Sequence, residues 1–367
     1  MKRTLTIILT ATALAAACTK SEVQHETPAE IGFAPAARNV TKAVMEGTLD
    51  ESVSLGVWAN WNGADGQVET GISDYSDYSN NFLVNASFSK KGDNWAGTDQ
   101  AYLWPTSGAL VFAGYTKSQR FENNMNVGVD EATYDFSTNS MTLDYSLYPQ
   151  LQYSFDLCWF ERTAASYNNR TSGNPVEVTL HHAMTWLTIN VKGDAATAPE
   201  DVNKKWKITD MRLLDACKQA VCTCSMKDGR MTAQWALADG QTTHVYLGKK
   251  NGDDTSESAL QLPLTQEAQA YEAVKDAIIV IPQTPLKLEV TYQCPTASGY
   301  TTKTATVDLT LTGHKDGEGN DITEDKRINM WEAGKHYTYT LVFRANEILV
   351  APSYGDWASS DQTITVE

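Results

Sequence analysis

The feature that most constrains this chain is a two-residue alternation of apolar and polar side chains, repeated in short runs. The runs at 109–116, 286–294 and 336–343 are clear examples, rich in Val, Thr and Tyr, which is typical of half-buried β-strands. Clusters of Gly, Asn, Asp and Pro separate the runs, and few windows hold a helical period. Many short strands with frequent turns favour β-sandwiches over βαβ units, so we predict an all-β fold. Further strands are predicted over 54–61, 151–160, 176–193, 206–214, 277–283 and 304–313.

The length and one polar interruption predict how the chain is divided. Its 367 residues suffice for two domains, and 42% hydrophobic residues allow a sizeable core. The polar stretch at 192–205 interrupts the strand pattern and is the best candidate for a boundary. We therefore expect domains over 43–195 and 196–367, after a polar segment at 18–42 that holds one short strand.

The first residues have the features of an export signal. Lys2 and Arg3 precede an apolar stretch over 5–17 that is too short to span a bilayer, and alanines lead directly into Cys18. This arrangement resembles a bacterial lipoprotein signal, in which the cysteine becomes the first mature residue and carries the lipid. We expect residues 1–17 to be the signal peptide and Cys18 the lipidation site. The alternative is an ordinary signal peptide that leaves Cys18 as a free thiol.

Charge and cysteine content narrow the partners and the covalent chemistry. The net charge of −16 argues against binding to nucleic acid or to anionic lipid head groups. An odd number of cysteines follows Cys18, so at least one is unpaired within a monomer, and one disulfide stays open. If a strand covers 220–226, Cys222 and Cys224 face the same side and are expected to be buried. The remaining cysteines are Cys158, Cys217 and Cys294.

No pattern in the sequence predicts catalysis, a cofactor or a metal site. Sequence motifs of serine hydrolases, zinc proteases and phosphate-binding loops are absent, so we expect a protein that is not an enzyme. His181 and His182 are adjacent on a predicted strand and point to opposite faces, so they cannot share a metal. The acidic stretch 316–327 resembles a calcium loop, but Asp321 and Arg327 replace the required glycine and glutamate, which indicates a solvated turn.

The tryptophans leave a second class of function open. Trp61 and Trp95 lie in polar surroundings and are candidates for a sugar-stacking platform. The rival to a structural role is therefore a monomeric, lipid-anchored glycan-binding protein. A hydrolase is a third possibility, because glycosidase carboxylates are often invisible in one sequence. Trp58, Trp104, Trp186 and Trp331 lie within or beside strand patterns and are expected in the core.

Three stretches carry a pattern of their own: AYLWPTSGALVFAGY at 101–115, LHHAMTWLTINV at 180–191 and the segment from Trp331 to Trp357. Together they resemble the fimbrillin family, the subunits of type V pili. The resemblance implies two tandem β-sandwich domains of transthyretin-like or Greek-key type. It also implies a lipoprotein precursor that reaches the outer membrane and the cell surface. The implied partners are other pilin subunits, in a homopolymer or mixed pilus, and a host or bacterial surface glycan or protein.

The resemblance further implies assembly by strand exchange after a protease cuts behind an Arg or Lys. A sandwich that lacks one strand exposes unpaired backbone groups beside an apolar groove, and a neighbour's strand satisfies both. Repeated head to tail, such contacts give a filament. Residues suited to these roles are Ile31 and Phe33 in the removable strand, Arg38 and Lys42 at the cut, and Ile364 and Val366 in the donor strand.

Two further alternatives remain at this point. Arg38 and Lys42 can be solvated linker charges, with the last residues forming an ordinary edge strand. A stalk, a tip and an anchor subunit are equally compatible with the sequence.

Overall fold

The structure is a computed structural model of the whole chain. It describes residues 29–37, 53–61, 80–356 and 364–365. Within 80–356 the description omits 93, 106–107, 119–120, 123–124, 127, 148–154, 167–174, 228–229, 248–260, 272–277 and 317.

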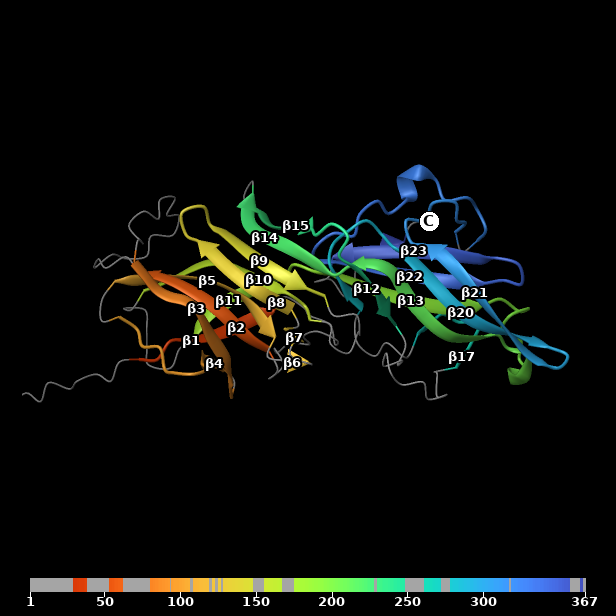
Figure 1. The fold of residues 1–367 in the computed structure, drawn as a ribbon, viewed down its shortest axis with the longest axis horizontal. Coiled ribbons are helices and arrows are strands. Elements are labelled where there is room, and N and C mark those ends of the chain that lie inside the picture. Colours follow the sequence, from red (N-terminus) through yellow and green to blue (C-terminus); the bar gives the residue numbers. More distant parts are fainter. Residues whose placement is uncertain are drawn as a thin grey trace, which may run out of the picture.

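The described residues form an almost purely β structure, so the all-β prediction is confirmed (Figure 1). The first sheet differs from an open sandwich layer because it closes on itself as a barrel. Closure occurs because β1 is paired on both of its edges, with β11 on one side and β4 on the other. The barrel order is β1 (Gly32–Ala37), β11 (Val176–His182), β10 (Cys158–Ser166), β5 (Ala109–Ser118), β2 (Val53–Trp61), β3 (Asn80–Lys91) and β4 (Asn94–Gly97).

Three further sheets and one small hairpin complete the described fold. One sheet has the order β15 (Arg230–Leu237), β14 (Gln219–Lys227), β9 (Ser140–Ser146), β8 (Gly128–Asp135). A second has the order β18 (Gln269–Ala270), β12 (Thr185–Gly193), β22 (Lys335–Phe343), β23 (Ile348–Asp356), β24 (Ile364–Thr365), with β19 (Ile278–Val280) also on β12. The third has the order β16 (Thr242–Tyr246), β13 (Lys207–Cys217), β20 (Lys287–Thr296), β21 (Gly299–Asp308), with β17 (Leu262–Pro263) also on β13. The hairpin is β6 (Phe121–Glu122) with β7 (Met125–Asn126), and the 3₁₀ turns are η3 (Val202–Lys204) and η4 (Glu324–Lys326).

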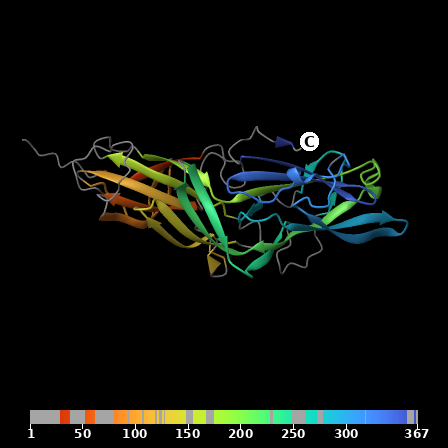
Figure 2. The same cartoon turned by 90° about the horizontal axis from the view of Figure 1, so that it is seen from above.

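The sheets gather into two lobes that lie end to end along the longest axis (Figures 1 and 2). The barrel and the β8–β9–β14–β15 sheet make one lobe, and the other two sheets make the second. Strand pairing crosses the expected boundary at residue 195 in both directions. β12 lies before that residue and pairs with β22, whereas β14 lies after it and pairs with β9.

The chain passes from the barrel to the second lobe inside the run 176–193, which was predicted as one strand and is in fact two. The break falls at Ala183 and Met184, between β11 and β12. The backbone groups at the break bond outside the ladder: the Ala183 amide donates to Leu157 O at 2.8 Å, and Met184 O accepts from the Gly334 amide at 2.8 Å. The apolar–polar alternation continues across the break, so the sequence alone does not indicate that the chain changes sheets here.

The buried faces of the strands explain most of the tryptophan predictions. Trp58, Trp104 and Trp331 are in the core as expected. Trp186 is half-buried and stacks on His336. Trp61 is half-buried and packs against the core. The proposed role of Trp95 is wrong, since its side chain is only 3% exposed in the barrel core and offers no stacking face to a sugar.

Local hydrogen bonds from aspartate side chains shape two loops. The strand predicted over 304–313 ends at Asp308, whose Oδ1 accepts from the amide of Thr310 at 2.9 Å and from its hydroxyl at 2.6 Å. These bonds compete with a continuing ladder. In the acidic stretch, Asp316 Oδ1 accepts three backbone amides, from Glu318, Gly319 and Asn320. The Asp316 carboxylate therefore stabilises the backbone of this turn.

All five cysteines after Cys18 are buried free thiols. Cys222 and Cys224 lie on one face of β14, as predicted, with their Sγ atoms 3.5 Å apart. Within the described part of the chain, no helix is long and apolar enough to cross a membrane.

Candidate functional site

The predicted removable strand is the element that closes the barrel. β1 runs parallel to β11, with Phe33 opposite Val176, and antiparallel to β4, with Phe33 opposite Trp95. Just before β1, the Ile31 amide donates to Tyr102 O at 2.7 Å, and Ala29 O accepts from the Trp104 amide at 3.0 Å. Residues 29–37 are therefore held along both sides by strands and loops from elsewhere in the chain.

Ile31 and Phe33 are the apolar contacts of this segment with the barrel interior, and each is 0% exposed. The Phe33 ring meets Phe88 edge to face at 4.9 Å and Phe112 at 5.3 Å, with Phe160 at 6.2 Å. Such aromatic pairs add to the burial of apolar area. The two residues therefore share one inward face, as their alternation predicted, and β1 itself spans Gly32 to Ala37.

Removal of residues 29–37 would leave two strand edges and an apolar gap between them. β11 would lose its parallel partner, and β4 would lose its antiparallel one. Unpaired edge groups beside an apolar groove form a template for another strand. The geometry therefore suits exchange of one strand for another.

The expected donor strand lies elsewhere. The backbone of Ile364 and Thr365 forms β24, which pairs with Tyr354 and Ser353 of β23. β24 and β1 belong to different sheets and lie in different lobes, as the dark blue and red ends of the chain show in Figure 2. The structure thus does not bring the two sets of residues together within one chain. Cys18, Arg38, Lys42 and Val366 lie outside the described residues, as does the side chain of Ile364.

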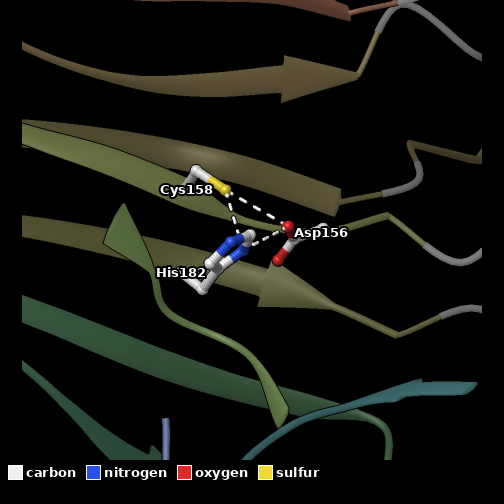
Figure 3. A group of neighbouring side chains, drawn as sticks. All are labelled: Asp156, Cys158 and His182. Carbon is white, nitrogen blue, oxygen red and sulfur yellow. Dashed lines mark hydrogen bonds and ion pairs between the residues drawn. The ribbon is translucent and has the colours of Figure 1, made fainter. Parts of the chain in front are cut away.

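A second group of residues was missed by the sequence reasoning, which expected no ligand cluster. Asp156, Cys158 and His182 meet at the end of β10 and β11 (Figure 3). The distances are 2.7 Å from His182 Nδ1 to Asp156 Oδ2, 3.4 Å from Nδ1 to Cys158 Sγ, and 3.2 Å from Sγ to Oδ2. As predicted from their opposite directions, His181 and His182 do not converge, but His182 has found other partners.

The sequence held a partial signal for this group. Asp156 and Cys158 are two residues apart, so an extended backbone directs both to one side. The missing information was the register that sets Cys158 directly opposite His182. Register depends on long-range pairing and cannot be read from the local pattern.

The group is not arranged as a nucleophilic triad. The Cys158 side chain is buried, and burial together with Asp156 raises the pKa of its thiol well above the ordinary value. Both Asp156 and Cys158 also face the same imidazole nitrogen, whereas a triad uses one nitrogen for each. A neutral, inaccessible thiol is a poor nucleophile.

Comparison with known proteins connects these observations to a family. A sequence profile described as fimbrillin-like matches residues 41–357. A search of curated proteins gave no match. A fimbrial protein from Bacteroides vulgatus has a similar structure, with a TM-score of 0.52, 16% identity, and coverage of 90% of this chain and 99% of that one. A candidate cell adhesion protein from Bacteroides uniformis gives a TM-score of 0.49 at 13% identity, with 90% and 99% coverage.

Proposed function

The chain belongs to the fimbrillin-like family, and on that premise we propose that it is a structural subunit of a cell-surface pilus with a role in adhesion. In this proposal the precursor is exported as a lipoprotein, cut by a protease, and joined to neighbours by exchange of β1 for a donor strand. Other pilin subunits are its partners, and no catalysis is involved.

The observation that carries the proposal is the position of β1 in the barrel wall. The segment comes first among the described strands and is paired on both edges, so a cut behind it would separate a complete wall strand from the rest. Burial of Ile31 and Phe33 stabilises the precursor by roughly 1.5–3 kcal/mol each. Each ladder hydrogen bond adds about 1 kcal/mol. An incoming strand with two matching apolar residues recovers similar free energy, so exchange is thermodynamically feasible.

The arrangement of lobes supports contact between chains rather than within one. β1 is in one lobe and β24 is in the other, so in our proposal an exchange that puts β24 residues in the place of β1 joins two chains. We propose Ile364 and Val366 as the residues that fill the positions of Ile31 and Phe33. A head-to-tail contact of this kind does not close and builds a filament.

Attachment to the outer membrane through Cys18 is the remaining part of the proposal. Its support is the signal-like sequence of residues 1–17 followed by cysteine. The variant Cys18→Ala should leave the protein in the periplasm or medium. If the variant still partitions with outer membrane as the parent does, the lipoprotein assignment is wrong.

The assembly proposal is tested by limited trypsin digestion of the purified precursor. We expect cleavage after Arg38 or Lys42, followed by conversion to oligomers or filaments seen by electron microscopy and size-exclusion chromatography. The double variant Arg38→Ala with Lys42→Ala should stay monomeric, while Ile364→Asp should be cut and yet fail to donate.

The surface variant Val84→Asp is the matched control for Ile364→Asp, because Val84 is 65% exposed. It should polymerise like the parent. If the uncut double variant polymerises, or cleaved parent remains monomeric at high concentration, stalk assembly by strand exchange is excluded. A tip subunit, an anchor subunit or a glycan-binding protein would then be the reading to pursue.

A further inference from the structure

We propose that Asp156, Cys158 and His182 form a binding site for a transition-metal cation, with Zn²⁺ as the best match. The site is separate from the strand-exchange function and does not depend on it. It lies at the end of the barrel where the chain leaves β11 for the second lobe (Figure 3).

Three donor atoms of different kinds converge on one buried point. The Asp156 side chain is 0% exposed and that of His182 is 7% exposed. From the three distances between Oδ2, Sγ and Nδ1, a point about 2.1 Å from Oδ2 and Nδ1 and about 2.3 Å from Sγ lies about 1 Å off the plane of the three atoms. Tetrahedral zinc would require Nδ1 and Oδ2 to separate by about 0.7 Å, which a small rotation of the imidazole can supply.

The second oxygen of Asp156 gives independent support. Oδ1 is buried, and no hydrogen-bond partner for it exists among the described residues. A buried carboxylate with an unsatisfied oxygen is unfavourable, because its lost hydration is only partly replaced. A cation bound to Asp156 would compensate this charge, which hydrogen bonds to Oδ2 alone do not.

The backbone around the site is held in place from several directions. The Thr116 hydroxyl accepts from the Cys158 amide at 2.8 Å. Tyr145 donates its hydroxyl hydrogen to Phe155 O at 2.6 Å, and the Ala183 amide donates to Leu157 O at 2.8 Å. Ligands that are already positioned lose little entropy when a metal binds.

A cleft of about 490 Å³ adjoins the site, and His182 is the ligand residue that lines it. Glu332 and Asp356 line the same cleft, where the Asp356 carboxylate is ion-paired with Lys335. Thiolate, imidazole and carboxylate together suit zinc better than calcium or magnesium, which prefer oxygen ligands only. Binding of the metal as a thiolate complex releases the Cys158 thiol proton to solvent.

The test uses the full chain with Cys18→Ala, which removes lipidation and one competing thiol. Addition of Co²⁺ should give one bound ion per chain and a thiolate-to-cobalt charge-transfer absorption. Zn²⁺ should displace the cobalt and raise the melting temperature. Cys158→Ser and His182→Gln should each weaken Co²⁺ binding by about 100-fold or more, and the near-isosteric Asp156→Asn by about 10- to 100-fold.

Two controls separate this site from other donors. His181→Gln changes the neighbouring histidine, which points to the opposite face, and should bind Co²⁺ like the parent. The double variant Cys222→Ser with Cys224→Ser removes the other close thiol pair and should keep the charge-transfer band, a result that does not require the site variants to fold. The proposal is wrong if no stoichiometric Co²⁺ binding occurs, if Cys158→Ser binds with unchanged affinity, or if the band disappears with Cys222 and Cys224.

Discussion

His336 shows how burial of one ionisable side chain ties stability to pH. Its ring stacks on Trp186 with a centroid separation of 3.7 Å and an interplanar angle of 7°. Its Nε2 atom lies 2.9 Å from the Thr188 hydroxyl. Burial lowers the pKa of His336 from 6.5 to about 4, because the protonated ring would lose hydration. The folded protein therefore holds this histidine neutral.

We predict that His336 makes the protein less stable as the pH falls from about 6.5 to about 4. In that window the unfolded chain binds a proton at this residue and the folded chain does not, so protons favour unfolding. The loss should approach about 3 kcal/mol for the full shift. Urea unfolding of the parent and of His336→Gln at several pH values measures it.

The variant should show a smaller decrease in unfolding free energy across this window. Val84→Ala changes an exposed side chain that does not titrate; it is the control and should decline with pH like the parent. If His336→Gln and the parent lose the same free energy between these pH values, the histidine is not responsible.

At the scale of single elements, the six-residue strand β1 contributes a central side chain to the packing of the barrel core. It supplies Phe33 to an aromatic group with Phe88, Phe112 and Phe160, each from a different strand of the barrel. A side chain at such a junction connects strands that are distant in sequence. Its truncation leaves a cavity that the fixed neighbouring rings cannot fill.

We predict that Phe33→Ala lowers the free energy of unfolding by about 3–5 kcal/mol. Hydrogen exchange should increase first in β4 and β11, the two strands that pair with β1. Val84→Ala is the matched control and should change stability by less than about 0.5 kcal/mol, because Val84 is largely exposed. Equal exchange in all barrel strands of Phe33→Ala would contradict a local role for β1.

Alternation in the sequence was sufficient to predict the elements that have one buried face. β12 and β22 alternate in burial as their sequences do, and Ile31 and Phe33 share the inward face that their spacing implied. The break at Ala183 was not predicted, because a strand that changes sheets keeps its alternation. Trp95 was assigned to the surface from its polar neighbours, although every second residue of a strand faces inward.

The two candidate sites differ in the same way: one depends on residues that are adjacent in sequence, and the other on the pairing of distant strands. β1, the candidate removable strand, could be predicted because its residues lie together in sequence. The Asp156–Cys158–His182 group could not, since it depends on the β10–β11 register.

At the scale of the whole molecule, each lobe contains strands from both sides of residue 195, and this shared strand pairing holds the two lobes together. β12, which precedes it, lies inside the six-stranded sheet of the second lobe, paired with β18, β19 and β22. β14 and β15, which follow it, complete the sheet of the first lobe beside β9. Neither half of the sequence therefore contains a full set of strands for one lobe.

We predict that residues 196–367 alone do not fold cooperatively, although composition and length allow a domain of that size. Without β12, the strand β22 loses its parallel partner over the register from Trp186–His336 to Gly193–Phe343. The β12 side chains Leu187, Ile189 and Val191, which are all buried, would leave an open core. β14 and β15 would lose β9, and the buried face that carries Cys222 and Cys224 would be exposed.

Calorimetry and near-UV circular dichroism should show one cooperative transition for the full chain and none for the fragment. Extending the fragment to start at residue 183 restores β12 and should recover part of the near-UV signal, whereas starting it at residue 194 should not. A sharp unfolding transition in residues 196–367 alone would show that the fragment folds without β12 and β9. The domain boundary would then lie in the polar stretch at 192–205, as the sequence predicted.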